Sequence, residues 1–232
     1  METVAIIPAA GQGKRAKAEL RKQFLPLNGK PVLAHTIARF EGVDAVNGVI
    51  VVAPKGLIRY CKEYIVEKYG FSKVFKVVVG GKNRQDSVRN GMDAISEGCS
   101  IVLVHDGVRP LVSQEHIHES IEYAKRYGAA IVAVKARETI KVASDDLIVI
   151  KTLDREGVWL AQTPQVFRYQ IIKDAYNLAY QQKFYGTDEA ALVERLGIQI
   201  KIVEGSYRNI KITTREDIGI AETIMNMKGE GW

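Results

Sequence analysis

Five runs of β-branched and other apolar residues alternate with segments of helical length, and this pattern constrains the fold more than any other feature. Each run is apolar at nearly every position, which is typical of strands buried on both faces of a sheet. Strands that alternate with helices predict βαβ units and a mostly parallel sheet covered by helices. The runs are Val4–Ile7, Val46–Val52, Val74–Val79, Ile101–Val104 and Ile131–Val134.

Helical signals fill the intervening segments. Pro31 suits the first turn of a helix, because the N–H that proline lacks has no partner there, and Ser113 precedes Glu115 at the start of another. The chain has 232 residues, which is enough for one large domain. The expected helices are Pro31–Phe40, Leu57–Lys68, Arg84–Glu97, Ser113–Tyr127, Ile171–Gln182, Thr187–Leu196 and one from about Thr214, with a last strand over Ile198–Val203.

The pattern changes between Ala136 and Phe167. Two pieces of alternating apolar and polar residues flank the turn signal Ser144–Asp145–Asp146. We interpret them as a β-hairpin arm over about 136–160, inserted into a single domain that spans residues 1–232.

Composition argues against several classes of protein. The net charge of +6 comes without a long Lys/Arg run, so a small anionic partner explains it as well as nucleic acid would, and we expect no nucleic acid. Cys61 and Cys99 belong to no C-x-x-C motif, which predicts reduced thiols. No apolar run approaches the ~18 residues of a membrane span, and no signal peptide is recognisable. We therefore expect a cytoplasmic protein without a membrane partner.

The loop PAAGQGKRA, residues 8–16, follows the first strand and fits the dinucleotide-binding spacing G-x-G-x-x-A. A dinucleotide site also needs a carboxylate at the end of the second strand, where this sequence reads VVAPK. A Walker loop is disfavoured because Arg15 stands where a Ser or Thr metal ligand is required. Either the loop grips a triphosphate with backbone N–H groups and nearby cations, or it is a turn with solvated lysines. The cations are Lys14, Arg15 and Lys22.

Asp106 follows the buried strand Ile101–Val104. Ligands of open α/β sheets bind at the carboxyl ends of strands, and a lone carboxylate there suits Mg²⁺, which completes its shell with phosphate oxygens and water. Arg109 is then available to an anion. The alternative is that Asp106 caps the following turn and His105 only packs.

Three further motifs are ambiguous when taken singly. In GGKNRQDSV, residues 80–88, Ser87 and backbone amides could contact a base or ribose, or Asp86 or Ser87 could merely cap a helix. Thr187 in GTDEA is either a pocket residue or an N-cap. Lys211 in NIKIT is either a pocket residue or a lysine at a strand end.

The usual signatures of nucleophilic and zinc chemistry are missing from the sequence. The four histidines form no H-E-x-x-H motif or Cys/His cluster, and there is no G-x-S-x-G elbow. The chemistry is therefore expected to depend on positioning and charge, as in phosphoryl and nucleotidyl transfer.

Taken in order, eight motifs make the chain resemble the sugar-alcohol-phosphate cytidylyltransferases from Met1 to about Met225: PAAGQGKR, KQF, GGKNRQDSV, LVHDGVRP, RETIK, LAQTPQVF, GTDEA and NIKITT. The motifs match best the members that act on 2-C-methyl-D-erythritol 4-phosphate in the non-mevalonate isoprenoid pathway. The resemblance implies a three-layer Rossmann-like fold of the nucleotide-diphospho-sugar transferase type, with the arm joining a homodimer. It also implies that CTP, with Mg²⁺, gives CDP-methylerythritol and pyrophosphate.

The resemblance implies a role for particular residues as well. Nucleotide binding falls on Ala9, Ala10, Gly11, Gly13, Lys14, Gly80, Gly81, Lys82, Ser87 and Gly107. Catalysis falls on Arg15, Lys22 and Lys211, and the metal ligand is Asp106. The acceptor phosphate is expected near Arg109, Thr163 and Thr187, with Thr139 and Arg155 reaching it from the other subunit's arm.

Departures from the family pattern leave alternatives. Gly107–Val108 replaces a small pair and keeps a ribitol-5-phosphate cytidylyltransferase as runner-up, whereas PAAG favours the methylerythritol enzyme. Lys82 stands where an acidic residue is common, so the contacts to the base are less defined. From other classes, an NAD-dependent oxidoreductase and a non-catalytic nucleotide-binding regulator remain as hypotheses.

Overall fold

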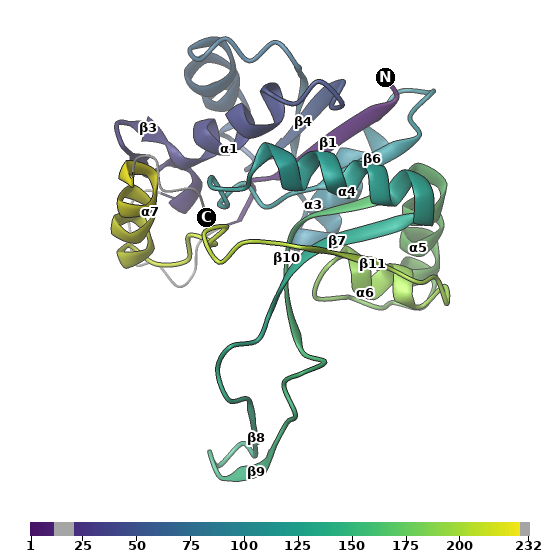
Figure 1. Cartoon of the computed structure of the whole chain (residues 1–232). Coiled ribbons are helices and arrows are strands. Elements are labelled where there is room, and N and C mark those ends of the chain that lie inside the picture. Colours follow the sequence, from purple (N-terminus) through teal and green to yellow (C-terminus); the bar gives the residue numbers. More distant parts are fainter. Residues whose placement is uncertain (12–20, 228–232) are drawn as a thin grey trace.

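A seven-stranded sheet forms the centre of the protein in the computed structural model, which describes residues 1–11 and 21–227. Its strand order is β11-β7-β10-β6-β1-β4-β5 (Figure 1). The inner strands β1, β4 and β6 are almost entirely buried, as their continuous apolar sequences require. The strands are β1 Thr3–Pro8, β4 Gly48–Ala53, β5 Val74–Val79, β6 Ile101–Val104, β7 Ala129–Lys135, β10 Trp159–Arg168 and β11 Lys201–Glu204.

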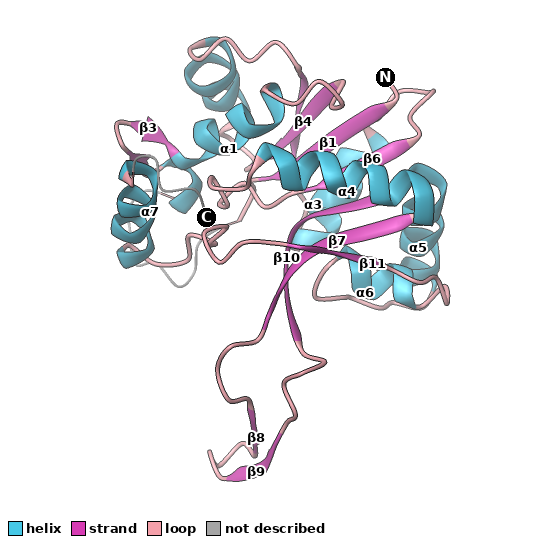
Figure 2. Cartoon of the chain, in the orientation of Figure 1, coloured by secondary structure: helices cyan, strands magenta, loops and turns pink. Residues whose placement is uncertain are grey.

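Helices cover both faces of this sheet, which gives three layers (Figure 2). On one face, apolar residues of α1 (Val32–Glu41), α4 (Gln114–Tyr127) and η2 (Cys61–Glu67) pack on the strands. On the other, α3 (Arg84–Asp93), α5 (Tyr169–Gln181) and α6 (Glu189–Glu194) do so. The predicted three-layer, mostly parallel α/β fold is confirmed.

Local signals fix where these helices begin and end. Ser113 caps α4 by accepting the N–H of His116 at 3.1 Å, and Gly128, with φ of 94°, ends that helix. The predicted helix over Arg84–Glu97 ends earlier, at Asp93. The predicted helix from Thr187 begins at Glu189, because Asp188 supplies the cap by accepting the N–H of Ala191 at 3.0 Å.

The C-terminal helix α7 (Glu216–Asn226) packs beside the small hairpin of β2 (Pro26–Leu27) and β3 (Lys30–Pro31). A third apolar cluster joins them, made of Leu27, Val32, Ile212 and Ala221. The short helix η1 (Lys22–Phe24) precedes β2, and the turn α2 (Ile58–Tyr60) precedes η2. Residues 22–31 and 211–226 therefore form one side of the molecule.

An arm extends away from the sheet between β7 and β10 (Figure 1). Its tip is the antiparallel pair β8 (Lys141–Ala143) and β9 (Val149–Thr152), and residues 147–150 are exposed there although they are apolar.

Strand β10 begins at Trp159, at the end of the expected arm, and continues inside the central sheet. Within the described residues it alone runs antiparallel to its sheet neighbours β6 and β7. Pro164 cannot donate to a strand ladder, which argues against a central strand from sequence. The sheet accommodates it because the pairing with β7 shifts register between Ala161 and Gln165.

Candidate active site

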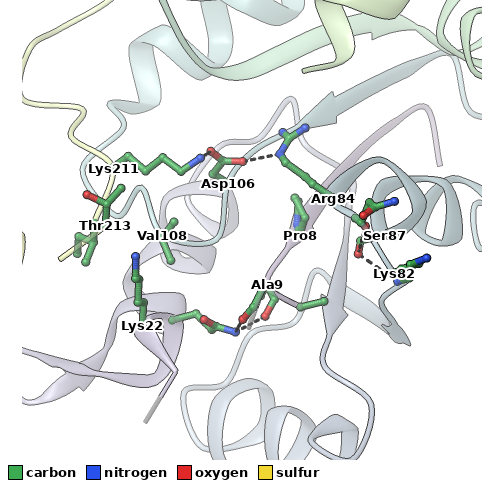
Figure 3. A pocket seen from close by; sticks show the side chains of 16 residues that line it. Pro8, Ala9, Lys22, Lys82, Arg84, Ser87, Asp106, Val108, Lys211 and Thr213 are labelled. Atoms are coloured by element: carbon green, nitrogen blue, oxygen red, sulfur yellow. Dashed lines mark hydrogen bonds and ion pairs between the residues drawn. The ribbon is translucent and has the colours of Figure 1, made fainter. Parts of the chain in front are cut away.

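A cavity of about 640 Å³ opens at the carboxyl ends of β1 and β6, where ligands of such sheets bind. Five separate stretches of the chain meet there, from the end of β1, η1, the start of α3, the loop after β6 and the loop before α7. The lining residues are Pro8, Ala9, Ala10, Gly11, Lys22, Gln23, Gly81, Lys82, Asn83, Arg84, Ser87, Asp106, Val108, Lys211, Ile212 and Thr213 (Figure 3).

Asp106 is the charged centre of this cavity. Lys211 Nζ lies 2.7 Å from its Oδ2, Arg84 Nε lies 3.1 Å from its Oδ1, and Arg109 Nε lies 3.9 Å from Oδ2. Burial alone would raise the pKa of Asp106, but the charges of Arg84, Lys211 and Arg109 outweigh it and hold the pKa well below its usual range. The carboxylate is therefore ionised. Its side-chain partners are the three cations, and the following turn is closed by a backbone hydrogen bond from the N–H of Arg109 to the carbonyl oxygen of Asp106 at 3.0 Å, which does not fit the capping alternative.

Arg84 ties Asp106 to a second, buried carboxylate. Its Nη1 lies 2.8 and 2.9 Å from the two oxygens of Glu189, whose side chain is 1% exposed. Tyr176 donates its hydroxyl to Glu189 Oε1 at 3.1 Å. Desolvation lowers the pKa of Arg84, yet Glu189 and Asp106 raise it by more, so the guanidinium stays charged.

A hydrogen-bonded network supports Asp106 from below the cavity surface. Thr163 accepts the backbone N–H of Asp106 at 3.1 Å, and its Oγ1 lies 3.0 Å from His105 Nδ1. The Nε2 of His105 lies 3.0 Å from the carbonyl oxygen of Arg109. Burial lowers the pKa of His105 to about 4, so the ring is neutral near pH 7. His105 packs and hydrogen-bonds in the interior.

Arg109 is turned inward. Its Nη1 donates to the carbonyl oxygen of Asn209 at 2.6 Å, and its side chain is 12% exposed. Asn209 in turn donates to the carbonyl oxygen of Thr163 at 2.9 Å. Arg109 and Thr163 thus lie beside Asp106 and do not line the cavity.

Close packing explains the small residues around the cavity. A Cβ on Gly80 would lie 2.2 Å from Ala10 Cβ and 3.0 Å from Ser87 Oγ. A Cβ on Gly107 would lie 3.1 Å from Ala9 Cβ. The two turns therefore pack directly against residues 9–10, and side chains on these glycines would push the backbones apart.

Hydrogen bonds hold the other backbone segments of the site. Gln23 donates Nε2 to the carbonyl oxygen of Ala9, and to that of Gly11 at 3.3 Å. Ser87 accepts the N–H of Gly81 at 3.1 Å, which fixes the second glycine turn. Asp86 accepts the N–H of Asn83 at 3.1 Å and so helps to cap the N-terminus of α3, in agreement with the alternative that Asp86 caps a helix.

The structure brings together most, but not all, of the predicted site residues. Lys22 and Lys211 lie on one side of the cavity, and Lys82 and Ser87 lie on the other (Figure 3). Thr187 is exposed and does not line the cavity, and Thr139 and Arg155 are exposed in the arm, where Arg155 donates to the carbonyl oxygen of Arg137. Gly13, Lys14 and Arg15 lie outside the described residues.

The lining residues that sequence reasoning missed include Arg84 and Gln23, whose side chains contact other residues of the site. Both stood inside quoted motifs, GGKNRQDSV and KQF, but one sequence gives no sign of which motif residue points into a cavity. Within residues 1–11 and 21–227, no three His, Cys, Asp or Glu side chains cluster as metal ligands. A metal at Asp106 would thus need oxygens from a substrate or water.

Comparison with known proteins identifies the family of this chain. The family model of 2-C-methyl-D-erythritol 4-phosphate cytidylyltransferase matches residues 3–227. The chain belongs to this family. A cytidylyltransferase of Geotalea uraniireducens is 51% identical over 97% of both chains, and one of Alkaliphilus oremlandii is 47% identical over 99% of this chain and 98% of its own.

Solved cytidylyltransferases have the same fold. The 4-diphosphocytidyl-2C-methyl-D-erythritol synthase of Anaerococcus prevotii is 34% identical, with a TM-score of 0.85 over 97% of this chain and 96% of its own. The 2-C-methyl-D-erythritol 4-phosphate cytidylyltransferase of Thermus thermophilus is 30% identical, with a TM-score of 0.79 over 97% and 98%.

Membership in the 2-C-methyl-D-erythritol 4-phosphate cytidylyltransferase family makes this chain a nucleotidyltransferase of isoprenoid biosynthesis. It converts CTP and 2-C-methyl-D-erythritol 4-phosphate to CDP-methylerythritol and pyrophosphate, and the ribitol 5-phosphate reaction is not favoured. Of the helices that the structure describes, none has both the length and the apolar character for a membrane crossing.

Proposed function

We propose that the cavity beside Asp106 binds CTP and carries out cytidylyl transfer to methylerythritol phosphate. The observation that supports this most is the meeting of Lys22, Lys211 and Asp106 on one cavity at the ends of β1 and β6. Two lysines on one wall suit the charged phosphates, and the glycine turn on the opposite wall suits the nucleoside.

The proposed reaction is an in-line displacement at the α-phosphorus of CTP. An oxygen of the acceptor phosphate forms the new P–O bond, while the bond to the β-phosphate breaks and pyrophosphate leaves. The acceptor phosphate is already an anion near neutral pH, so no general base is needed. Lys22, Lys211 and Arg15 stabilise charge on the α-phosphate and the departing pyrophosphate. Backbone groups at Ala9, Ala10 and Gly11, with Gly13 and Lys14, hold the triphosphate.

Mg²⁺ fits the residues present at this site. Asp106 is kept ionised and has its oxygens at the cavity, as a hard cation requires. We propose that Asp106 holds Mg²⁺, which would neutralise phosphate charge, and that Lys211 would then leave Oδ2 for a phosphate oxygen. Lys211 is free to do so because its side chain is 43% exposed.

We assign the nucleoside to the second glycine turn and the acceptor to residues beside Asp106. Gly80, Gly81, Lys82, Ser87 and Gly107 would contact the base and ribose. Arg109, Thr163 and Thr187 would serve the acceptor phosphate, the buried Arg109 and Thr163 chiefly through their contacts with Asp106 and its neighbours.

The arm is proposed to complete a second copy's site in a homodimer. Its apolar tip, with Leu147 87% exposed and Ile148 66% exposed, favours burial against another protein surface. Thr139 and Arg155 would then reach the acceptor bound in the other subunit.

The free thiols of Cys61 and Cys99 support the proposed cytoplasmic setting.

Pyrophosphate release tests this function. The protein, CTP and Mg²⁺ are combined with methylerythritol 4-phosphate or ribitol 5-phosphate in parallel. We expect rapid release with the first acceptor and little with the second. The reverse preference would contradict the assigned acceptor, and CTP binding without release from either would contradict the proposed role of the cavity.

A further inference from the structure

Arg84 has two carboxylate partners that differ in burial. Its Nε contacts Asp106 at the cavity, and its Nη1 contacts Glu189, the buried first residue of α6, which also accepts a hydrogen bond from Tyr176 of α5. Removing the cation from a buried carboxylate leaves an uncompensated charge, which is strongly unfavourable. Arg84 is therefore held in place by Glu189, whatever occupies the cavity.

The two cations that contact Asp106 therefore differ in how freely they can move. Lys211 approaches Oδ2 from the loop before α7, has a long flexible side chain and is 43% exposed. Arg84 approaches Oδ1 from the start of α3, and Figure 3 shows the two on opposite sides of the carboxylate. An exposed lysine exchanges partners readily, whereas a guanidinium that bridges two carboxylates has a fixed orientation.

We propose that Arg84, anchored by Glu189, is a positioning residue that fixes Oδ1 of Asp106 and so keeps Oδ2 turned toward the cavity, where Lys211 is the exchangeable partner. This rests on the proposed function, because the ligand that replaces Lys211 is Mg²⁺ with CTP. A lysine in place of Arg84 keeps the charge but has no planar fork to span both carboxylates. A positive charge at position 84 is therefore not sufficient to orient Asp106.

The test uses Arg84→Lys and Glu189→Gln, which keep size and, for the first, charge. Matched controls are Arg89→Lys, on the same helix α3 but paired with Asp93 at 3.9 Å, and Glu194→Gln at the exposed end of α6. CTP binding is titrated by calorimetry at graded Mg²⁺ without an acceptor, and thermal unfolding is recorded alongside.

We expect Arg84→Lys and Glu189→Gln to raise the Mg²⁺ concentration for half-maximal CTP binding by about 10- to 100-fold, as for residues that orient metal ligands. CTP binding without metal should weaken by much less than CTP binding at limiting Mg²⁺, and the controls should match wild type. The double variant should be no worse than the weaker-binding single variant, since the pair acts as a unit.

An unchanged Mg²⁺ midpoint in Arg84→Lys would overturn the inference. This holds even if the melting temperature of the variant falls, because a lower melting temperature alone is the result expected if Arg84 only links α3 to α6. If Glu189→Gln does not fold, Arg84→Lys decides alone. Wild-type protein that binds no CTP with Mg²⁺ would overturn the proposed function together with this inference, whereas normal wild-type binding with unchanged variants overturns the inference alone.

Discussion

The Oγ1 of Thr163 lies 3.0 Å from Nδ1 of His105, which joins β10 to the end of β6 beside the cavity. The carbonyl oxygen of Arg109 can only accept, so the neutral ring carries its proton on Nε2, and Nδ1 accepts the hydroxyl of Thr163, whose oxygen also accepts the N–H of Asp106. A second proton on the ring would place two donors against each other.

The first prediction concerns pH. In the unfolded chain, His105 takes up a proton near its ordinary pKa of 6.5. In the folded protein it takes up this proton only at lower pH, because its pKa is lowered to about 4. The folded state binds fewer protons in this window, so the free energy of unfolding should fall as the pH drops from 6.5 toward 4, by up to about 3 kcal/mol. The depressed pKa of Asp106 acts in a lower window, below its ordinary value of 3.8.

Urea unfolding at a series of pH values measures this effect. His105→Gln should flatten the slope between pH 6.5 and 4, and His118→Gln, at an exposed position of α4, should not. An unchanged slope in His105→Gln would show that other groups cause the pH dependence.

The second prediction concerns the two lysines of the cavity. Lys22→Ala and Lys211→Ala should each fold but lose about 100- to 1000-fold in kcat, because each removes a cation that stabilises transition-state charge. In Lys211→Ala, Asp106 keeps Arg84 and Arg109 as partners, so its charge stays compensated. The control is Lys62→Ala, at an exposed position of η2. Pyrophosphate release at saturating CTP gives kcat, and wild-type turnover in either variant would remove that lysine from the mechanism.

The third prediction concerns the second glycine turn. Gly80→Ala forces a Cβ to 2.2 Å from that of Ala10, so the turn and the segment that follows β1 must separate. We expect about 1–3 kcal/mol of destabilisation and weaker CTP binding. Gly219→Ala is the matched control, because a Cβ there meets nothing within 4 Å and the residue lies in α7. Thermal unfolding with and without CTP measures both effects, and a Gly80→Ala protein with wild-type affinity would exclude the turn from nucleotide binding.

The fourth prediction tests the arm. Arg155→Ala should raise KM for methylerythritol phosphate and leave CTP affinity unchanged. If the arm acts on the other subunit, mixing Arg155→Ala with Lys22→Ala should restore about a quarter of wild-type activity at acceptor concentrations well below the wild-type KM, since half of the dimers are mixed and each contains one intact site. Mixtures no more active than their components would mean that each arm serves its own chain or none.

The strands of the fold were predictable where the apolar pattern of the sequence matches the burial of the same residues in the structure. Runs such as Ile101–Val104 are apolar throughout and form central strands with those bounds. Strand β10 was not predictable as a central strand, because Pro164 contradicts the strand signal and only the neighbouring strands supply the pairing. The position of β10 in the sheet depends on tertiary packing, which cannot be read from a single sequence.

The site was predictable as a set of motifs but not as a set of contacts. Asp106 and Lys211 were both chosen from sequence, and their 2.7 Å contact depends on the fold. The anchoring of Arg84 by Glu189 brings together α3 and α6, which lie far apart along the chain. Nothing local to either residue distinguishes it from an exposed charge at the start of a helix.

Strand β10 begins where the arm returns and continues to Thr163 beside the cavity. Residues inserted between β8 and β9 would only lengthen the tip of the arm. One residue inserted between Leu160 and Thr163 would instead reverse the faces of the side chains that follow and move the Thr163 hydroxyl away from His105. The length of the arm can therefore change while the contacts of Thr163 at this cavity stay the same, so the exposed tip is under weaker structural constraint than the base of the strand that carries it.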